Sequence, residues 1–252
     1  MSLWRPETLR AGIETGRVFL MAHRPQGDVE AGARAVVPGG DAVAALRELL
    51  AAEARRVRRI DIVVSDAMAH FLVFGRLSGV RGAGEMRLAL AALFEERFGA
   101  SPAQWTVAAD IDPFAASGLA CALPRVLVDG CIAACRSAGL REISIVPFFV
   151  AAVRGAARRI GRNAWVLARA DGQVTLAQRA AGVWTTVRAQ PATDDDSAEL
   201  LVARERLRLG QEHGEWPVFA LGRWPSAADE RSAVSGTNGA SSRGVAMTDE
   251  IA

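Results

Sequence analysis

A glycine-turn pattern that occurs twice constrains the fold of this chain more than any other feature. The stretch Gly16–Ala22 is similar to Gly172–Ala177, and each follows a short apolar run. Apolar runs on both sides of a turn glycine are typical of β-hairpins. We therefore predict hairpins over residues 9–24 and 165–188, each followed by a helix and a further strand. Two such halves form a two-lobed α/β protein, unless two unrelated hairpins share this short turn pattern by chance.

Apolar periodicity predicts the remaining elements. Residues 25–40 are rich in Gly, Pro and Ala, which predicts a loop or an irregular third strand. Asp41 caps the next helix, and the last turns of that helix are expected to hold Arg55, Arg56, Arg58 and Arg59. Further helices are expected at 85–98, 124–137, 147–159 and 194–209. Further strands are expected at 60–64, 71–74, 105–109, 119–123, 143–146 and 217–222.

Changes of composition along the chain predict its domain organisation. Residues 1–8 are expected to be an N-terminal extension, 9–160 a first lobe and 161–225 a second, smaller lobe. From residue 226 onward the chain is mostly Ser, Gly, Ala and Thr with few large apolar residues. Such a segment cannot bury enough apolar surface to fold, so we expect 226–252 to be a disordered tail.

The basic residues exclude several classes of function. All 30 of them are arginine, and 28 acidic residues leave a formal net charge of +2. A chain without lysine has no Walker-type phosphate lysine, no Schiff-base lysine and no kinase strand lysine. A charge so near zero also argues against a nucleic-acid binder. With three scattered histidines and no Cys-x-x-Cys, a metal site is not expected.

Four clusters contain residue types that could carry chemistry, and each has a simpler explanation. Ser65, Asp66 and His70 are too close in sequence for a hydrolase triad and predict a turn before a strand. Asp110 and Asp112 could bind a metal ion, but they suit a turn. The three aspartates at 194–196 could also bind a cation, but a helix N-terminus explains them without one. Cys131 and Cys135 could form a redox or metal pair, but we favour buried apolar positions on a helix.

The turns of the two hairpins are the remaining candidate site. Between lobes, phosphates are held by backbone N–H groups of glycine turns, and a carboxylate holds the metal ion. Glu14-Thr15-Gly16 has the acid-x-glycine spacing of such a turn. Asp171-Gly172 is its expected counterpart in the second half.

With these residues in view, the chain resembles the actin-like superfamily, which has a ribonuclease H-like duplicated fold. The early Ile13-Glu14-Thr15-Gly16 turn and the stretch from Leu119 through Pro124 to Pro147 are similar to the PilM-type proteins of type IV pilus assembly and the GspL-type domains of type II secretion. The resemblance covers residues 9–225. Nucleotide-binding members have Asp in place of Glu14, a lysine nearby, and two or three glycines where this chain has Gly222 before Arg223-Trp224.

These departures, set beside the resemblance, imply a member that keeps the scaffold and has lost the nucleotide. Glu14, Gly16, Asp171, Gly172 and Gly222 would then be vestigial, with no catalytic residue, cofactor or metal. The implied function is a cytoplasmic scaffold that binds the cytoplasmic segment of an inner-membrane assembly protein, with a motor ATPase and a second copy as further candidate partners. The N-terminus shows no signal peptide and no window is long and apolar enough for a membrane span. An actin-like ATPase or small-molecule kinase is the alternative, with Glu14, Asp110 or Asp171 on Mg²⁺.

Overall fold

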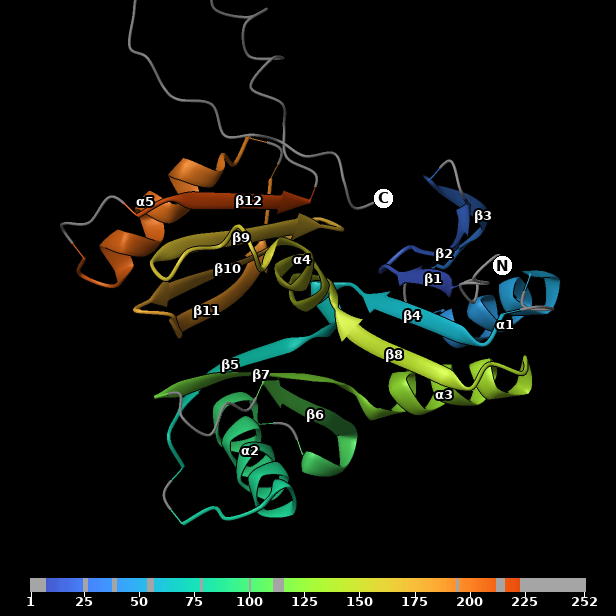
Figure 1. The fold of residues 1–252 in the computed structure, drawn as a ribbon, viewed down its shortest axis with the longest axis horizontal. Helices are drawn as coiled ribbons and strands as arrows, with labels where there is room; N and C mark the ends of the chain where they lie inside the picture. The colour runs from blue at the N-terminus through green and yellow to red at the C-terminus, as the bar shows by residue number, and fades with distance from the viewer. Residues whose placement is uncertain are drawn as a thin grey trace, which may run out of the picture.

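Three β-sheets organise the chain (Figure 1). The computed structural model describes residues 8–24, 27–37, 40–53, 57–77, 79–99, 101–110, 116–193, 195–211 and 216–222. Residues 1–7 of the expected N-terminal extension and the whole expected tail, 226–252, lie outside the described residues.

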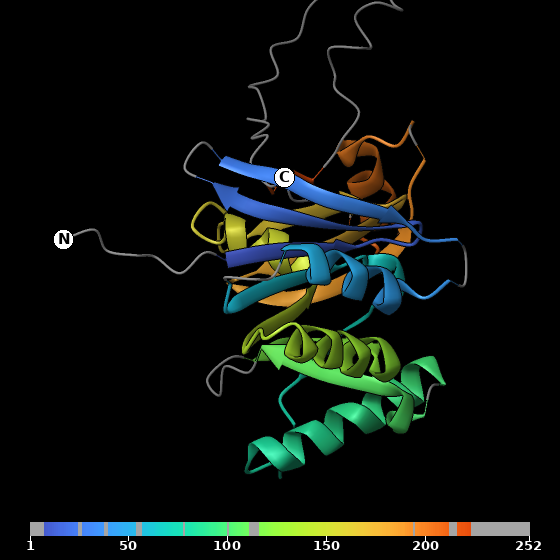
Figure 2. The ribbon, with the colours of Figure 1, turned by 90° about the vertical axis from the view of Figure 1, so that its right-hand side faces the viewer.

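The first sheet has the strand order β3-β2-β1-β4-β8. Its strands are β1 (Thr8–Ile13), β2 (Arg17–Arg24), β3 (Gly27–Ala35), β4 (Arg59–Val64) and β8 (Glu142–Pro147). The predicted hairpin is confirmed, since β1 and β2 are antiparallel, whereas β1, β4 and β8 are parallel. Helices α1 (Ala42–Glu53) and α3 (Arg125–Ser137) pack against each other beside this sheet (Figure 2). Residues 27–35, expected to be a loop or an irregular strand, form the strand β3.

The second hairpin belongs to a different sheet, of order β11-β10-β9-β12. Its strands are β9 (Ala164–Ala170), β10 (Gln173–Ala180), β11 (Val183–Pro191) and β12 (Val218–Gly222). Both turns adopt the left-handed conformation that a tight hairpin requires, with φ of 51° and 67° at Asp171 and Gly172 and 51° and 92° at Ala181 and Gly182. Helix α5 (Ala198–Arg208), capped by the Ser197 hydroxyl, connects β11 to β12, and α4 (Phe148–Ala156) follows β8.

A third sheet is inserted into the first half and was not predicted. Strands β5 (His70–Gly75), β7 (Ser117–Pro124) and β6 (Trp105–Asp110) pair in that order, with α2 (Ala83–Phe98) packed against them. The expected strand 71–74 therefore pairs with β7. Phe74 stands opposite Gly118, where a Cβ would lie 2.4 Å from the phenyl ring, so the aromatic ring covers the glycine.

One continuous core joins the two hairpin sheets. Fully buried Ile13 and Ile62 of the first sheet share it with Phe149 of α4 and with Val166 of β9. A separate cluster around Trp165 and Leu167 packs under α5, and another lies between the third sheet and α2. The expected lobe boundary between residues 160 and 161 stays a prediction.

The first helix is shorter than the sequence indicated. It ends at Glu53, so the expectation that Arg58 and Arg59 lie in its last turns is wrong, and Arg55 and Arg56 lie outside the described residues. Arg59 begins β4, because Ile60 and Ile62, which follow it, are strand residues with fully buried side chains. Val57 is buried in the connection between the helix and β4.

Candidate functional site

The turns of the two hairpins touch each other directly. The backbone N–H of Thr15 donates to Asp171 Oδ2 at 2.8 Å, and the Thr15 hydroxyl donates to Asp171 Oδ1 at 2.9 Å. We call this pair of hydrogen bonds the clasp. The sequence predicted that Glu14–Gly16 and Asp171–Gly172 are counterparts, and the structure brings them together. The contact is made through Thr15, which the sequence analysis did not single out.

The clasp engages one backbone N–H of the first turn and the Asp171 carboxylate of the second. A bound phosphate requires N–H donors that point into open space between the turns. Here the Thr15 N–H and both oxygens of the Asp171 carboxylate are directed at one another.

Gly222, the fifth predicted position, lies at the end of β12 against β9 and α4. Its φ is 85°, and a Cβ placed there would lie 2.2 Å from the Arg169 carbonyl oxygen and 3.0 Å from the Phe148 ring. This glycine is therefore explained by close backbone packing in the left-handed conformation. It requires no ligand.

A buried carboxyl group lies at the junction of the two halves. Asp66, directly after β4, is 5% exposed and accepts hydrogen bonds from the Phe149 N–H at 3.0 Å and from the Thr175 hydroxyl at 2.7 Å. Burial raises the pKa of Asp66 to about 6, although the hydrogen bonds from Phe149 and Thr175 oppose this shift. Asp66 thus connects β4, α4 and β10.

The other sequence candidates do not form sites among the described residues. Ser65 caps the short 3-10 turn at Ala67, whereas the His70 ring stacks on Phe98 with centroids 4.4 Å apart, so no triad with Asp66 exists. Burial raises the pKa of the Cys131 thiol to about 12, which supports the apolar interpretation of that residue. Asp112 and Asp194 lie outside the described residues, and within the described ranges no group of His, Cys, Asp or Glu could hold a metal ion.

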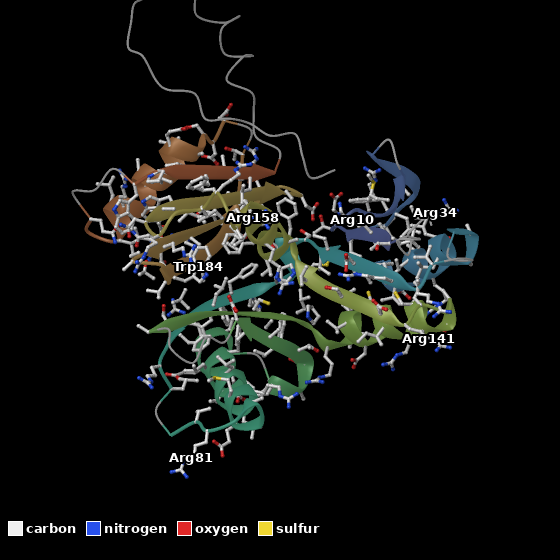
Figure 3. All side chains as sticks on the ribbon, in the orientation of Figure 1. Arg10, Arg34, Arg81, Arg141, Arg158 and Trp184 are labelled. Atoms are coloured by element: carbon white, nitrogen blue, oxygen red, sulfur yellow. The ribbon has the colours of Figure 1, made fainter. Side chains whose placement is uncertain are left out.

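Arginines lie on widely separated parts of the described chain. Figure 3 shows Arg34 and Arg141 on the side of α1 and α3, and Arg81 at the opposite, lower end of the view. Trp184, on β11, lies on the side that faces β5, and its carbonyl oxygen accepts a hydrogen bond from the Ser117 hydroxyl. The third sheet therefore covers the outer side of β11.

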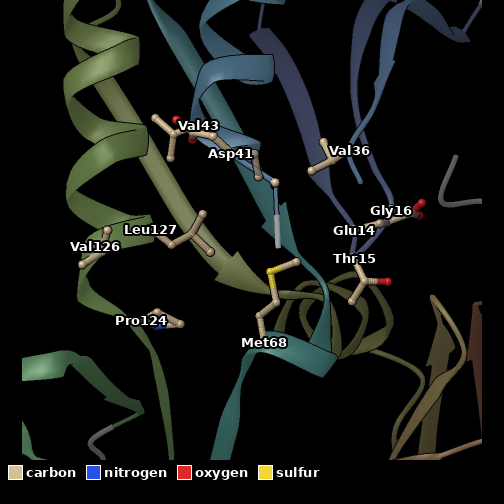
Figure 4. Close-up of a pocket in the computed structure, with 12 residues that line it drawn as sticks. Glu14, Thr15, Gly16, Val36, Asp41, Val43, Met68, Pro124, Val126 and Leu127 are labelled. Atoms are coloured by element: carbon tan, nitrogen blue, oxygen red, sulfur yellow. The ribbon is translucent and has the colours of Figure 1, made fainter. Parts of the chain in front are cut away.

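A groove of about 620 Å³ opens beside the clasp, where α1 and α3 both begin (Figure 4). Its lining is mostly apolar, and Glu14 and Asp41 also contribute to it. Val126, on the rim, is 84% exposed. We call this the α1/α3 groove; the apolar side chains that line it are Val36, Ala42, Val43, Met68, Pro124, Val126 and Leu127. The sequence analysis missed it because its residues come from four separate segments, although the Pro124 and Asp41 helix starts were both recognised.

Comparison with solved structures identifies the fold. The chain is similar to the cytoplasmic domain of EpsL, an inner-membrane component of the type II secretion system of Vibrio cholerae, with 12% identity, a TM-score of 0.56, and coverage of 87% of this chain and 84% of that one. It is similar to a Bacteroides thetaiotaomicron protein of unknown function with an actin-like ATPase fold, at 10% identity, a TM-score of 0.61 and coverage of 90% and 86%.

A third similar structure is the PilM-PilN type IV pilus biogenesis complex, with 18% identity, a TM-score of 0.52 and coverage of 81% of this chain and 70% of that one. No family model and no curated protein matches the sequence. The predicted actin-like fold is confirmed, with PilM and EpsL among the structures that share it. In the part of the chain that the structure describes, no helix is long and apolar enough to cross a membrane.

Proposed function

We propose that this chain is a non-catalytic scaffold of a pilus or secretion assembly, and that its α1/α3 groove binds the cytoplasmic segment of an inner-membrane partner. The observation that carries the proposal is the clasp, which closes the place where an actin-like protein would hold phosphate and leaves the groove beside it open. The likeness to EpsL and to the PilM-PilN complex supports the class of assembly. A location at the cytoplasmic face of the inner membrane belongs to the same proposal.

The loss of nucleotide binding rests on three features. No lysine is present to neutralise a phosphate, the Asp171 carboxylate is bonded by Thr15, and Gly222 packs against Arg169 and Phe148. A triphosphate needs several convergent N–H donors and a cation. Binding one here would require the two Thr15–Asp171 bonds to open first.

The chemistry of the α1/α3 groove indicates what kind of peptide fits it. Val36, Met68 and Leu127 offer apolar contact, and the two acidic residues of the lining, Glu14 and Asp41, add negative charge. A short segment with apolar anchors and at least one Arg or Lys complements both features. Cytoplasmic segments next to membrane spans carry an excess of Lys and Arg, so this charge suits such a partner.

The groove also adjoins the junction between the two halves. Met68 lines it, and Asp66, two residues earlier in the same 3-10 turn, bonds to Phe149 and Thr175. A segment bound in the groove would therefore contact the turn that holds the two sheets together.

A pull-down from membrane extract with the full chain tests the proposal, using Val126→Glu as the groove variant. Leu88→Glu is the matched control, because Leu88 is 75% exposed on α2, away from the groove. We expect the wild-type chain and Leu88→Glu to recover the same inner-membrane assembly protein and Val126→Glu to recover at least tenfold less. Equal recovery by all three would remove the groove from the proposal.

The alternative function, an actin-like ATPase or small-molecule kinase, is tested by calorimetry with Mg-ATP. We expect no saturable binding. Micromolar binding that Glu14→Ala abolishes would overturn the proposal that this chain has lost nucleotide binding. The same conclusion would follow if a nucleotide raised the melting temperature of the protein while no membrane partner was recovered. A motor ATPase and a second copy of the chain remain further proposed partners.

A further inference from the structure

The two hairpin sheets are built by the same order of elements, and they differ at one edge. The first runs β1-β2-β3-α1-β4 and the second β9-β10-β11-α5-β12. In both, the first strand pairs with the hairpin strand on one side and with a parallel strand, β4 or β12, on the other. β4 is then flanked by β8, whereas among the described residues β12 has β9 as its one strand neighbour.

The backbone of β12 directs part of its hydrogen-bonding groups toward this edge. The Trp165 N–H donates to the Pro217 carbonyl oxygen at 2.9 Å, and Val218 is in register with Trp165. In a parallel ladder, alternate residues bond to each side. Pro217 and Phe219 therefore bond to β9, and Val218, Ala220 and Gly222 direct their N–H and C=O groups to the outer edge.

The matching positions of β4 and β12 also differ in burial. By register with β1 and β9, Ile60, Ile62 and Val64 of β4 correspond to the outward-bonding residues of β12. All three are completely buried. Their counterparts Val218 and Ala220 are only partly buried, and Gly222 is exposed.

Within the described residues, β12 itself lacks three features that commonly protect a free strand. Edge strands are commonly blocked by charged residues, proline or a bulge. β3, the edge of the first sheet, has charged residues along its sequence, and a register shift occurs where β2 pairs with it. β11 lies beside β5 and β7. The segment Val218–Gly222 has no charged residue and no proline, and its pairing with β9 is regular.

We propose that the outer edge of β12 binds an extended peptide segment of a partner protein, which adds to the second sheet as a fifth, parallel strand. The first sheet supplies the template: β8 runs parallel to β4, and its Ile143 and Ile145 are an i, i+2 pair of β-branched residues. The expected ligand has the same alternation of β-branched side chains. This site is separate from the α1/α3 groove, so a scaffold could hold two partners at once.

Two other occupants fit the edge less well. A second copy that pairs β12 with its own β12 around a twofold axis would run antiparallel, unlike the template. The chain's own residues 223–252 contain no i, i+2 pair of β-branched residues. Main-chain bonds to a strand edge supply the affinity in this mode of recognition, and alternate side chains supply the selectivity.

The probe for the test is a synthetic peptide with the β8 sequence Arg141–Pro147, and a scrambled peptide is its control. Amide hydrogen exchange of the full chain is measured with and without each peptide. We expect the β8 peptide, and not the scrambled one, to slow exchange at Ala220 and Gly222 at least tenfold. Ala220→Pro, which removes an outward N–H, should abolish the effect, whereas Ala220→Ser, which keeps it, should not.

Circular dichroism melting of both Ala220 variants checks that they fold. No slowing by the β8 peptide at millimolar concentration, or equal slowing in the proline variant, would overturn the proposal. Slow amide exchange at Ala220 and Gly222 without any peptide, at every protein concentration, would mean that later residues of the same chain occupy the edge. Protection that grows with protein concentration alone would assign it to a second copy, and either result contradicts a partner strand.

Discussion

The first and second hairpin sheets show what this duplicated architecture needs and what it can leave out. Both keep a hairpin, a helix and a parallel strand, yet the first adds β8, α3 and an inserted third sheet, whereas the second is described only as far as Gly222. In the first sheet, β4 is fully buried on alternate residues, and β12 is not. The repeated unit is therefore enough to make a sheet, and the added elements decide which strand edges are covered.

The largest expected effect on the free energy of unfolding comes from truncating a buried side chain of β4, compared with one of β12. Ile62→Ala removes a side chain with no exposed surface, flanked by β1 and β8, and should lower the free energy of unfolding by about 4 kcal/mol. Leu221→Ala, in β12 at 8% exposure, should cost about 2 kcal/mol. Urea denaturation measures both. Equal losses would mean that β12 is as well enclosed as β4.

A second comparison concerns the carboxyl group where the halves meet. Because the pKa of Asp66 is raised from 3.8 to about 6 in the folded state, the folded protein binds this proton more tightly than the unfolded chain. Stability from this group is fully present below about pH 4 and is lost as the pH rises to about 6. The loss should be on the order of 2–3 kcal/mol.

Asp66→Asn should remove this pH dependence, which appears as the difference between wild-type and variant unfolding free energies from pH 4 to 7. Asp61→Asn is the control, since Asp61 lies on β4, the strand before Asp66, and pairs with Arg59 at 3.2 Å. If the unfolding free energies of the wild type and Asp66→Asn change with pH in parallel, Asp66 does not titrate between pH 4 and 7.

The smallest effect is expected at the clasp. Thr15→Val removes the side-chain hydrogen bond to Asp171 and should cost about 0.5–1 kcal/mol, as is usual for an exposed neutral donor. Asn also tolerates the left-handed φ of 51° at position 171, so Asp171→Asn removes the negative charge and preserves the turn. A double-mutant cycle by urea denaturation should give a coupling of about 0.5 kcal/mol. Strict additivity would show that the turns touch without stabilising each other.

Local patterns predicted most elements because turn chemistry and apolar periodicity act within a few residues. Asp171-Gly172 specified its hairpin, and Gly99, with φ of 67°, ends α2 where expected. The pairing of β5, β7 and β6 was not predicted, since strands separated by a helix leave no local signal for their partners. Asp66 was assigned to a simple turn for the same reason: its partner Thr175 is 109 positions away.

The clasp also bears on the order of events during folding. Thr15 and Asp171 are 156 positions apart in the sequence, whereas each hairpin forms from neighbouring strands. Contacts so distant along the chain bring a large entropic cost of loop closure, so they tend to form after the local pairings. A bond absent from the transition state slows escape from the native state and leaves the rate of reaching it unchanged. The junction of the two turns is thus a determinant of how long the folded protein lasts.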